Sequence, residues 1–122
     1  MTADRALFNF FSGFGMPAYP ETAVPDDTIM PYLTYTTAFG AWGDVPVSLT
    51  VKMWFHTESE TVPTEKAWQV MRRIGAGINI PCDGGCIFLT MGQPRCIPFT
   101  HESDKTIKGR MLNISAAYNI LI

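Results

Sequence analysis

In the stretch LNISAAYNILI, residues 112–122, mostly apolar side chains alternate with small or polar ones almost without interruption. One face of this stretch holds Leu112, Ile114, Ala116, Tyr118, Ile120 and Ile122. A repeat of two residues is typical of a half-buried β-strand. We expect this strand to begin near Thr106 and to be held in a sheet, because loose chain ends are normally polar and frayed.

The remaining elements follow from periodicity and from turn residues read outward from this strand. Val47 to Phe55 alternates in the same way and predicts a second strand, which pairs with a strand over residues 32–37 as a hairpin. We expect helices over 2–12 and 64–75, a short strand over 86–91 that Gly92-Gln93-Pro94 ends, and an irregular Pro/Gly-rich connection at 13–31.

The order of these elements predicts the fold class. Helix, two strands, helix and two strands indicate an α+β domain in which helices pack on one face of a mostly antiparallel β-sheet. A length of 122 residues fits a single domain, 1–122, with a real hydrophobic core.

Composition narrows the classes of function. Only 16% of the residues are charged while 47% are hydrophobic, so either much of the surface contacts other protein or the core is large. Residues 1–64 hold seven acids and two bases, whereas residues 65–122 hold four acids and seven bases. These opposite halves attract each other within one fold or between neighbouring copies. No dense basic patch for nucleic acid is present, and no stretch is long and apolar enough to span a membrane.

The cysteines and one histidine form the one metal-like pattern of the sequence. Cys82, Cys86, Cys96 and His101 have a spacing with which three sulfurs and an imidazole could surround zinc. The competing interpretation, which we favour, is that the cysteines are buried as small hydrophobic residues. Cys82 and His101 could also be a nucleophile and its base, but no residue is placed to orient the imidazole. We therefore expect no enzyme, no metal and no cofactor. Three cysteines and no secretory signal indicate a reducing, intracellular site of synthesis.

Several surface side chains are candidates for contacts with partners. Trp42 lies between glycines, where an aromatic ring either anchors an interface or folds back on the core. Arg72 and Arg73 lie on the polar face of the second helix, which is either solvated or in contact with acidic groups of a neighbouring subunit. Lys105, Lys108 and Arg110 flank the start of the last strand. They either protect a sheet edge against aggregation, which we favour, or line a surface near nucleic acid.

Several short segments follow one another in a characteristic order over residues 30–122. The set comprises Pro31-Tyr32-Leu33-Thr34-Tyr35, Val47 to Trp54, Thr64 to Ile74, Gly84-Gly85-Cys86-Ile87-Phe88-Leu89, Gly92-Gln93-Pro94, Pro98-Phe99, and Asp104 to Arg110 leading to Asn113 and Tyr118. In this order and spacing the chain resembles the tail terminator, or tail-completion, proteins of long-tailed bacteriophages.

The resemblance implies a structural virion protein that is assembled in the cytoplasm of the host bacterium. Such a protein forms a homohexameric ring on the head-proximal end of the tail tube, stops tube growth and joins a head-completion or connector protein. Viral DNA passes through the lumen without sequence-specific contacts. The interface residues assigned on this basis are Trp42, Arg72, Arg73, Phe99, His101, Asp104, Lys105 and Lys108. The alternatives are a head-completion or stopper protein of the neck and, in a different class, a small zinc- or ligand-binding domain.

Overall fold

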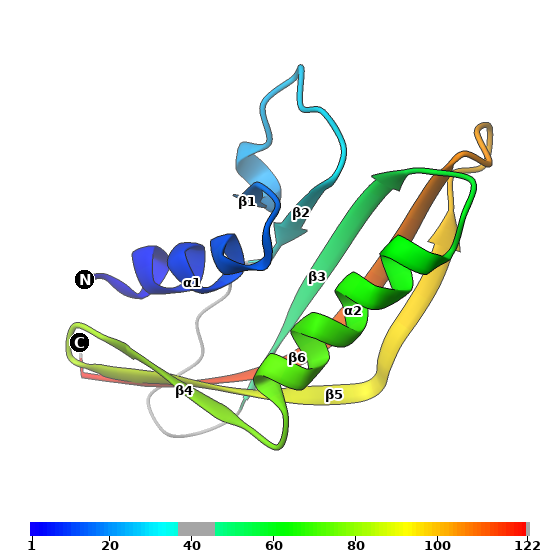
Figure 1. Ribbon diagram of the computed structural model, residues 1–122. Helices are drawn as coiled ribbons and strands as arrows, with labels where there is room; N and C mark the ends of the chain where they lie inside the picture. Colours follow the sequence, from blue (N-terminus) through cyan, green and yellow to red (C-terminus); the bar gives the residue numbers. More distant parts are fainter. Residues whose placement is uncertain (37–45, 122) are drawn as a thin grey trace.

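A computed structural model describes residues 1–36 and 46–121 of the chain (Figure 1). In these residues the elements are α1 (Ala3–Phe11), η1 (Ser12–Phe14), β1 (Ala18–Pro20), η2 (Glu21–Ala23), β2 (Tyr32–Tyr35), β3 (Val47–His56), α2 (Thr61–Ile74), β4 (Ile78–Cys82), β5 (Gly85–Thr100) and β6 (Ile107–Ile120), where η1 and η2 are single 3-10 turns. Within this part of the chain, neither helix is long and apolar enough to cross a membrane.

The strands form one curled six-stranded sheet in the order β1-β2-β3-β6-β5-β4 (Figure 1). Four neighbouring pairs are antiparallel, but β1 pairs with β2 in parallel, so the sheet is mixed. The α+β class is confirmed, whereas a purely antiparallel arrangement is not observed. The predicted hairpin is confirmed as well, because β2 pairs with β3 with Leu33 opposite Met53.

The alternation in β3 and β6 places one side chain of every two in the core. Val51 and its partner Leu112 are both fully buried, and the inward residues of β3 and β6 continue this pattern along both strands. The expected C-terminal strand is therefore a central strand, flanked by β3 and β5. Burial of this apolar face supplies most of the driving force for folding, at roughly 25 cal/mol per Å².

Both helices pack on the same face of the sheet and share its core with β3 and β6 (Figure 1). The hydroxyl of Thr2 caps α1 by accepting a hydrogen bond from the Arg5 N–H at 3.2 Å. From α1 the buried ring of Phe11 stacks on Tyr35 of β2 with 4.9 Å between ring centroids. Helix α2 starts three residues earlier than predicted, at Thr61, and it ends before Gly75, whose φ of 55° an L-residue rarely adopts.

Three predictions about the strands require correction. β5 does not end at Gly92-Gln93-Pro94: a register irregularity between Met91 and Cys96 absorbs this turn-like segment, and the strand continues to Thr100. β4 is an additional strand, which tolerates Pro81 because it lies at the sheet edge. The connection at 13–31 is not wholly irregular, since β1 within it forms the opposite edge.

Candidate functional site

The first candidate surface is the face of the sheet that lies opposite the helices, which we call the outer face. Its register-paired positions on β2, β3, β6 and β5 carry Lys52 as their one charged side chain. Large side chains on it are only half-buried or are exposed: Tyr32, Trp54, Met111, Phe88, Ile97 and Phe99. Uncharged polar side chains such as Thr50, Asn113 and Ser115 share the outer face with them, and Glu21 borders Lys52. An apolar patch among uncharged polar groups is typical of a protein–protein contact surface.

An aromatic pair across β6 organises the end of the outer face that lies next to the β5–β6 hairpin tip. Trp54 of β3 and Phe99 of β5 both lie opposite Gly109 of β6. Because Gly109 has no side chain, the two rings meet edge to face above it, with centroids 4.9 Å apart. Phe99, a predicted interface residue, therefore lies on the outer face, where its ring also covers the backbone of a central strand.

The second candidate surface is a groove of about 540 Å³ between α1 and α2, which we call the helix groove. It is lined by Asn9, Phe10, Gly13, Phe14, Gln69, Arg72 and Arg73. The rings of Phe10 and Phe14 pack edge to face at 5.5 Å, and the guanidinium of Arg73 lies 5.7 Å from the Phe10 ring centroid. Arg72 lies over the half-exposed ring of Trp68 at 5.9 Å. The groove thus combines an apolar floor with two cations, which sequence reasoning had placed on the helix but not beside Phe10 and Phe14.

The predicted interface residues His101, Asp104 and Lys105 lie together at the tip of the β5–β6 hairpin. The Ser103 N–H donates to Nδ1 of His101 at 3.2 Å, and the Thr106 N–H donates to Asp104 at 2.9 Å. The Thr106 hydroxyl also donates to Asp104, and these hydrogen bonds lower the pKa of its carboxyl. His101 also lines a depression of about 320 Å³ together with Trp54 and Phe99, so the tip continues into the outer face.

Lys108 lies in a charge cluster under the start of α2. Its Nζ is 3.8 Å from Glu60, whose carboxylate also accepts a short hydrogen bond from the buried Arg110. The Arg110 guanidinium donates a further hydrogen bond to the Thr64 hydroxyl at 3.1 Å. The hydrogen bond from Arg110 lowers the pKa of the Glu60 carboxyl, and the positive charges of Arg110 and Lys108 add to the effect. The idea that Lys108 protects a sheet edge is wrong, because β6 is central and this cluster joins it to α2.

The proposed zinc ligands do not come together. Cys86 and Cys96 lie opposite Asn119 and Leu112 of β6, which are roughly 20 Å apart along that strand. Cys82 lies on β4, while His101 lies at the distant hairpin tip, so these two cannot form a nucleophile–base pair either. None of the three cysteines is fully buried, but Cys82 and Cys96 pack against the core as small hydrophobic residues, and burial raises the pKa of their thiols. Across 1–36 and 46–121, no three His, Cys, Asp or Glu side chains are grouped to hold a metal ion.

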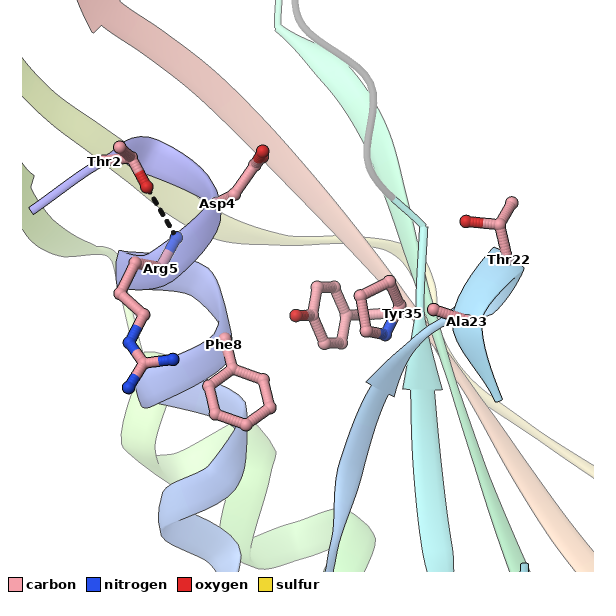
Figure 2. A pocket seen from close by; sticks show the side chains of 8 residues that line it. Thr2, Asp4, Arg5, Phe8, Thr22, Ala23 and Tyr35 are labelled. Atoms are coloured by element: carbon pink, nitrogen blue, oxygen red, sulfur yellow. Dashed lines mark hydrogen bonds between the residues drawn. The ribbon is translucent and has the colours of Figure 1, made fainter. Parts of the chain in front are cut away.

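A further pocket of about 500 Å³ opens between the start of α1 and the β1–η2 segment (Figure 2). Figure 2 shows Tyr35 pointing toward α1, the helix that carries Asp4 and Arg5. Burial, and then the negative charge of Asp4, raise the pKa of the Tyr35 phenol. The Arg5 guanidinium lies over the Phe8 ring at 5.4 Å. The pocket therefore brings the almost fully buried Tyr35 close to two exposed charged side chains, Asp4 and Arg5.

The last predicted interface residue, Trp42, lies outside the described residues. Comparisons with protein-family models, with curated proteins and with solved structures gave no match to this chain. The proposed function therefore rests on the residues of this chain and on their arrangement.

Proposed function

We propose that this chain is a structural virion protein that closes the head-proximal end of a phage tail tube as a ring. The ring ends tube polymerisation and presents its other side to the head-completion or connector protein. The order of segments over residues 30–122, which resembles that of the tail terminator proteins, supports this proposal. Its activity is binding and steric blocking, with no turnover.

The observation that carries the proposal is the outer face. In a protein that acts alone, a sheet face of this size is usually covered by helices or carries alternating charges. Here an apolar patch faces outward among uncharged polar side chains, with Lys52 and the bordering Glu21 as its charges. The patch comprises Tyr32, Trp54, Ile97, Phe99 and Met111. A subunit whose outer face packs against other protein in the assembled tail accounts for this composition.

The separation of the two candidate surfaces supports a ring. The outer face and the helix groove lie on opposite sides of the sheet, because both helices pack on its inner face. Contacts between unlike surfaces of identical subunits are heterologous, and they close into a ring when the rotation between neighbours allows it. A closed ring on the tube covers the surface to which the next tube subunits would add. DNA then passes through the lumen without base-specific contacts.

The proposal is tested by mass measurement and negative-stain imaging of the purified protein, alone and mixed with tail tubes isolated from a long-tailed phage. Rings of about six copies, or added density at one end of each tube, are the expected result. A monomer that leaves tubes unchanged would overturn the proposal. A ring that does not prevent soluble tube subunits from extending the tubes would favour the neck stopper alternative.

A matched pair of variants shows whether the outer face takes part. Ile97 on the outer face is 37% exposed, and Val62 at the start of α2 is 50% exposed. We expect Ile97→Asp to reduce ring formation or tube capping by at least about tenfold, since it places a charge at the centre of an apolar contact. The same exchange at Val62 should leave both properties unchanged.

A further inference from the structure

The loop between η2 and β2, residues 24–31, has the chemistry of an inserting arm. We call it the arm. The side chain of Ile29 is 83% exposed, the largest exposed fraction among the large hydrophobic residues of the described chain. Asp26 and Asp27 precede it and are exposed, without an ion pair to any residue within 1–36 and 46–121. Figure 1 shows the arm extending beyond β1 and β2, away from α1.

The arm has a defined shape. The Thr28 hydroxyl donates to the carbonyl of Pro25 at 2.6 Å, and the Thr28 N–H donates to the same oxygen at 3.3 Å. These two bonds close a turn over Pro25 to Thr28 and present Asp26 and Asp27 immediately before Ile29. A preformed segment loses less conformational entropy when it docks than an unstructured one does.

The helix groove offers the complementary chemistry. Its floor consists of the Phe10 and Phe14 rings, and its cations are Arg72 and Arg73, neither of which has an ion pair with a described residue. Lys66 holds one wall in place, since its ammonium donates to the carbonyl of Phe14 at 2.7 Å and so joins η1 to α2. Arginine and aromatic side chains of this kind are enriched where binding energy concentrates at interfaces.

We propose that the arm of one copy docks in the helix groove of the next copy. Ile29 packs on the half-buried Phe10 ring where this ring lines the groove, and Asp26 and Asp27 pair with Arg72 and Arg73. The groove volume of about 540 Å³ accommodates a branched aliphatic side chain together with both carboxylates. This inference rests on the proposed function in that it names the joint between neighbouring subunits of the ring.

Within a single chain, the arm extends beyond the β1–β2 edge while the groove lies between the helices, and Ile29 remains exposed to solvent. The contact is therefore made between unlike surfaces of two copies, which gives each subunit one arm to donate and one groove to fill. This is the heterologous arrangement that a closed ring requires.

Charge reversal tests the contact directly. The arm variant combines Asp26→Arg with Asp27→Arg, and the groove variant combines Arg72→Glu with Arg73→Glu. Each variant alone places like charges together, so we expect it to need at least about tenfold higher concentration to assemble. An equimolar mixture of the two variants restores opposite charges at every joint if the copies alternate, and it should assemble like the wild type. The matched control, Glu58→Arg, changes an exposed acid outside the arm, the helix groove and the outer face and should assemble normally.

Assembly is measured by light scattering of the protein alone across concentrations and by imaging on tail tubes, so the two proposals can fail separately. Unchanged assembly of either reversed variant, or a mixture no better than its components, overturns the arm contact. Wild-type rings that respond to charge reversal but ignore tubes support the contact and overturn the tube-capping function. Tube capping by the wild type and by both reversed variants overturns the contact alone. A wild type that stays monomeric and leaves tubes bare overturns both.

Discussion

Replacing Gly109 by alanine tests whether the aromatic pair on the outer face is held in place by the glycine beneath it. A Cβ built on Gly109 would overlap the Phe99 ring, far inside van der Waals contact. The backbone itself accepts alanine, because Gly109 is not among the residues with positive φ. Any loss of stability therefore reports on the ring and not on backbone strain.

The expected magnitude follows from two opposing effects. Overpacking a well-filled site costs about 1–3 kcal/mol, and exchange of glycine for alanine recovers about 0.4–1 kcal/mol by restricting the unfolded chain. We expect Gly109→Ala to lower the free energy of unfolding by about 1–2 kcal/mol. In a Phe99→Ala background the overlap is gone, and the same exchange should be neutral or slightly stabilising.

The assay is a double-mutant cycle measured by urea unfolding at one protein concentration, with the m-value checked for constancy. Gly13→Ala is the matched control, since nothing lies within 4 Å of a Cβ at that position. A coupling energy of about 1.5–3 kcal/mol between positions 99 and 109 is expected. A value below about 0.5 kcal/mol would refute the reasoning, because it would mean that the ring moves aside without cost.

Three further changes probe the contacts that hold the fold together. Glu60→Gln removes the carboxylate partner of the buried Arg110 and should destabilise the protein by about 0.5–1 kcal/mol at neutral pH, because the Glu60 side chain is 58% exposed and solvent screens the pair. Because the folded pKa of Glu60 is lowered, its contribution is complete above the unfolded value of about 4.3 and disappears as the pH falls through the folded pKa; an equal acid-induced loss of stability in both proteins would contradict this. Gly85→Ala would drive a Cβ into a backbone carbonyl of β6, and chemical denaturation should show a loss near the upper end for overpacking, about 3 kcal/mol; a mild effect would show that the β4–β5 turn is free to shift. Thr2→Ala removes the cap on the Arg5 N–H and should cost about 0.5–2 kcal/mol, measured by thermal unfolding, with an unchanged melting temperature as the contrary result.

The elements with strong periodicity were predictable because their pattern is local. Alternation in β3 and β6 and the apolar stripe of α2 are properties of consecutive residues, and so is the Thr2 cap of α1. The positions of Arg72 and Arg73 on the exposed side of α2 followed in the same way. The residues that complete the helix groove could not be predicted in this way, because Phe10 and Phe14 lie more than fifty residues before the α2 residues of the groove. The sequence shows Ile29 in a polar loop, but only the folded structure shows that its side chain is exposed and free to contact a partner.

Short-range periodicity alone predicts the α+β class, both helices, the β2–β3 hairpin and the burial pattern of the two longest alternating segments. The tertiary structure decided what depends on pairing between distant segments. β5 continues through Gly92-Gln93-Pro94, because β6 offers backbone partners on both sides of the irregularity. The tertiary structure also added β1 in parallel and β4 at the opposite edge, where prolines are tolerated. Finally, it separated the cysteines and joined Lys108 to Glu60, because residues along one strand are spread out whereas residues on packed elements meet.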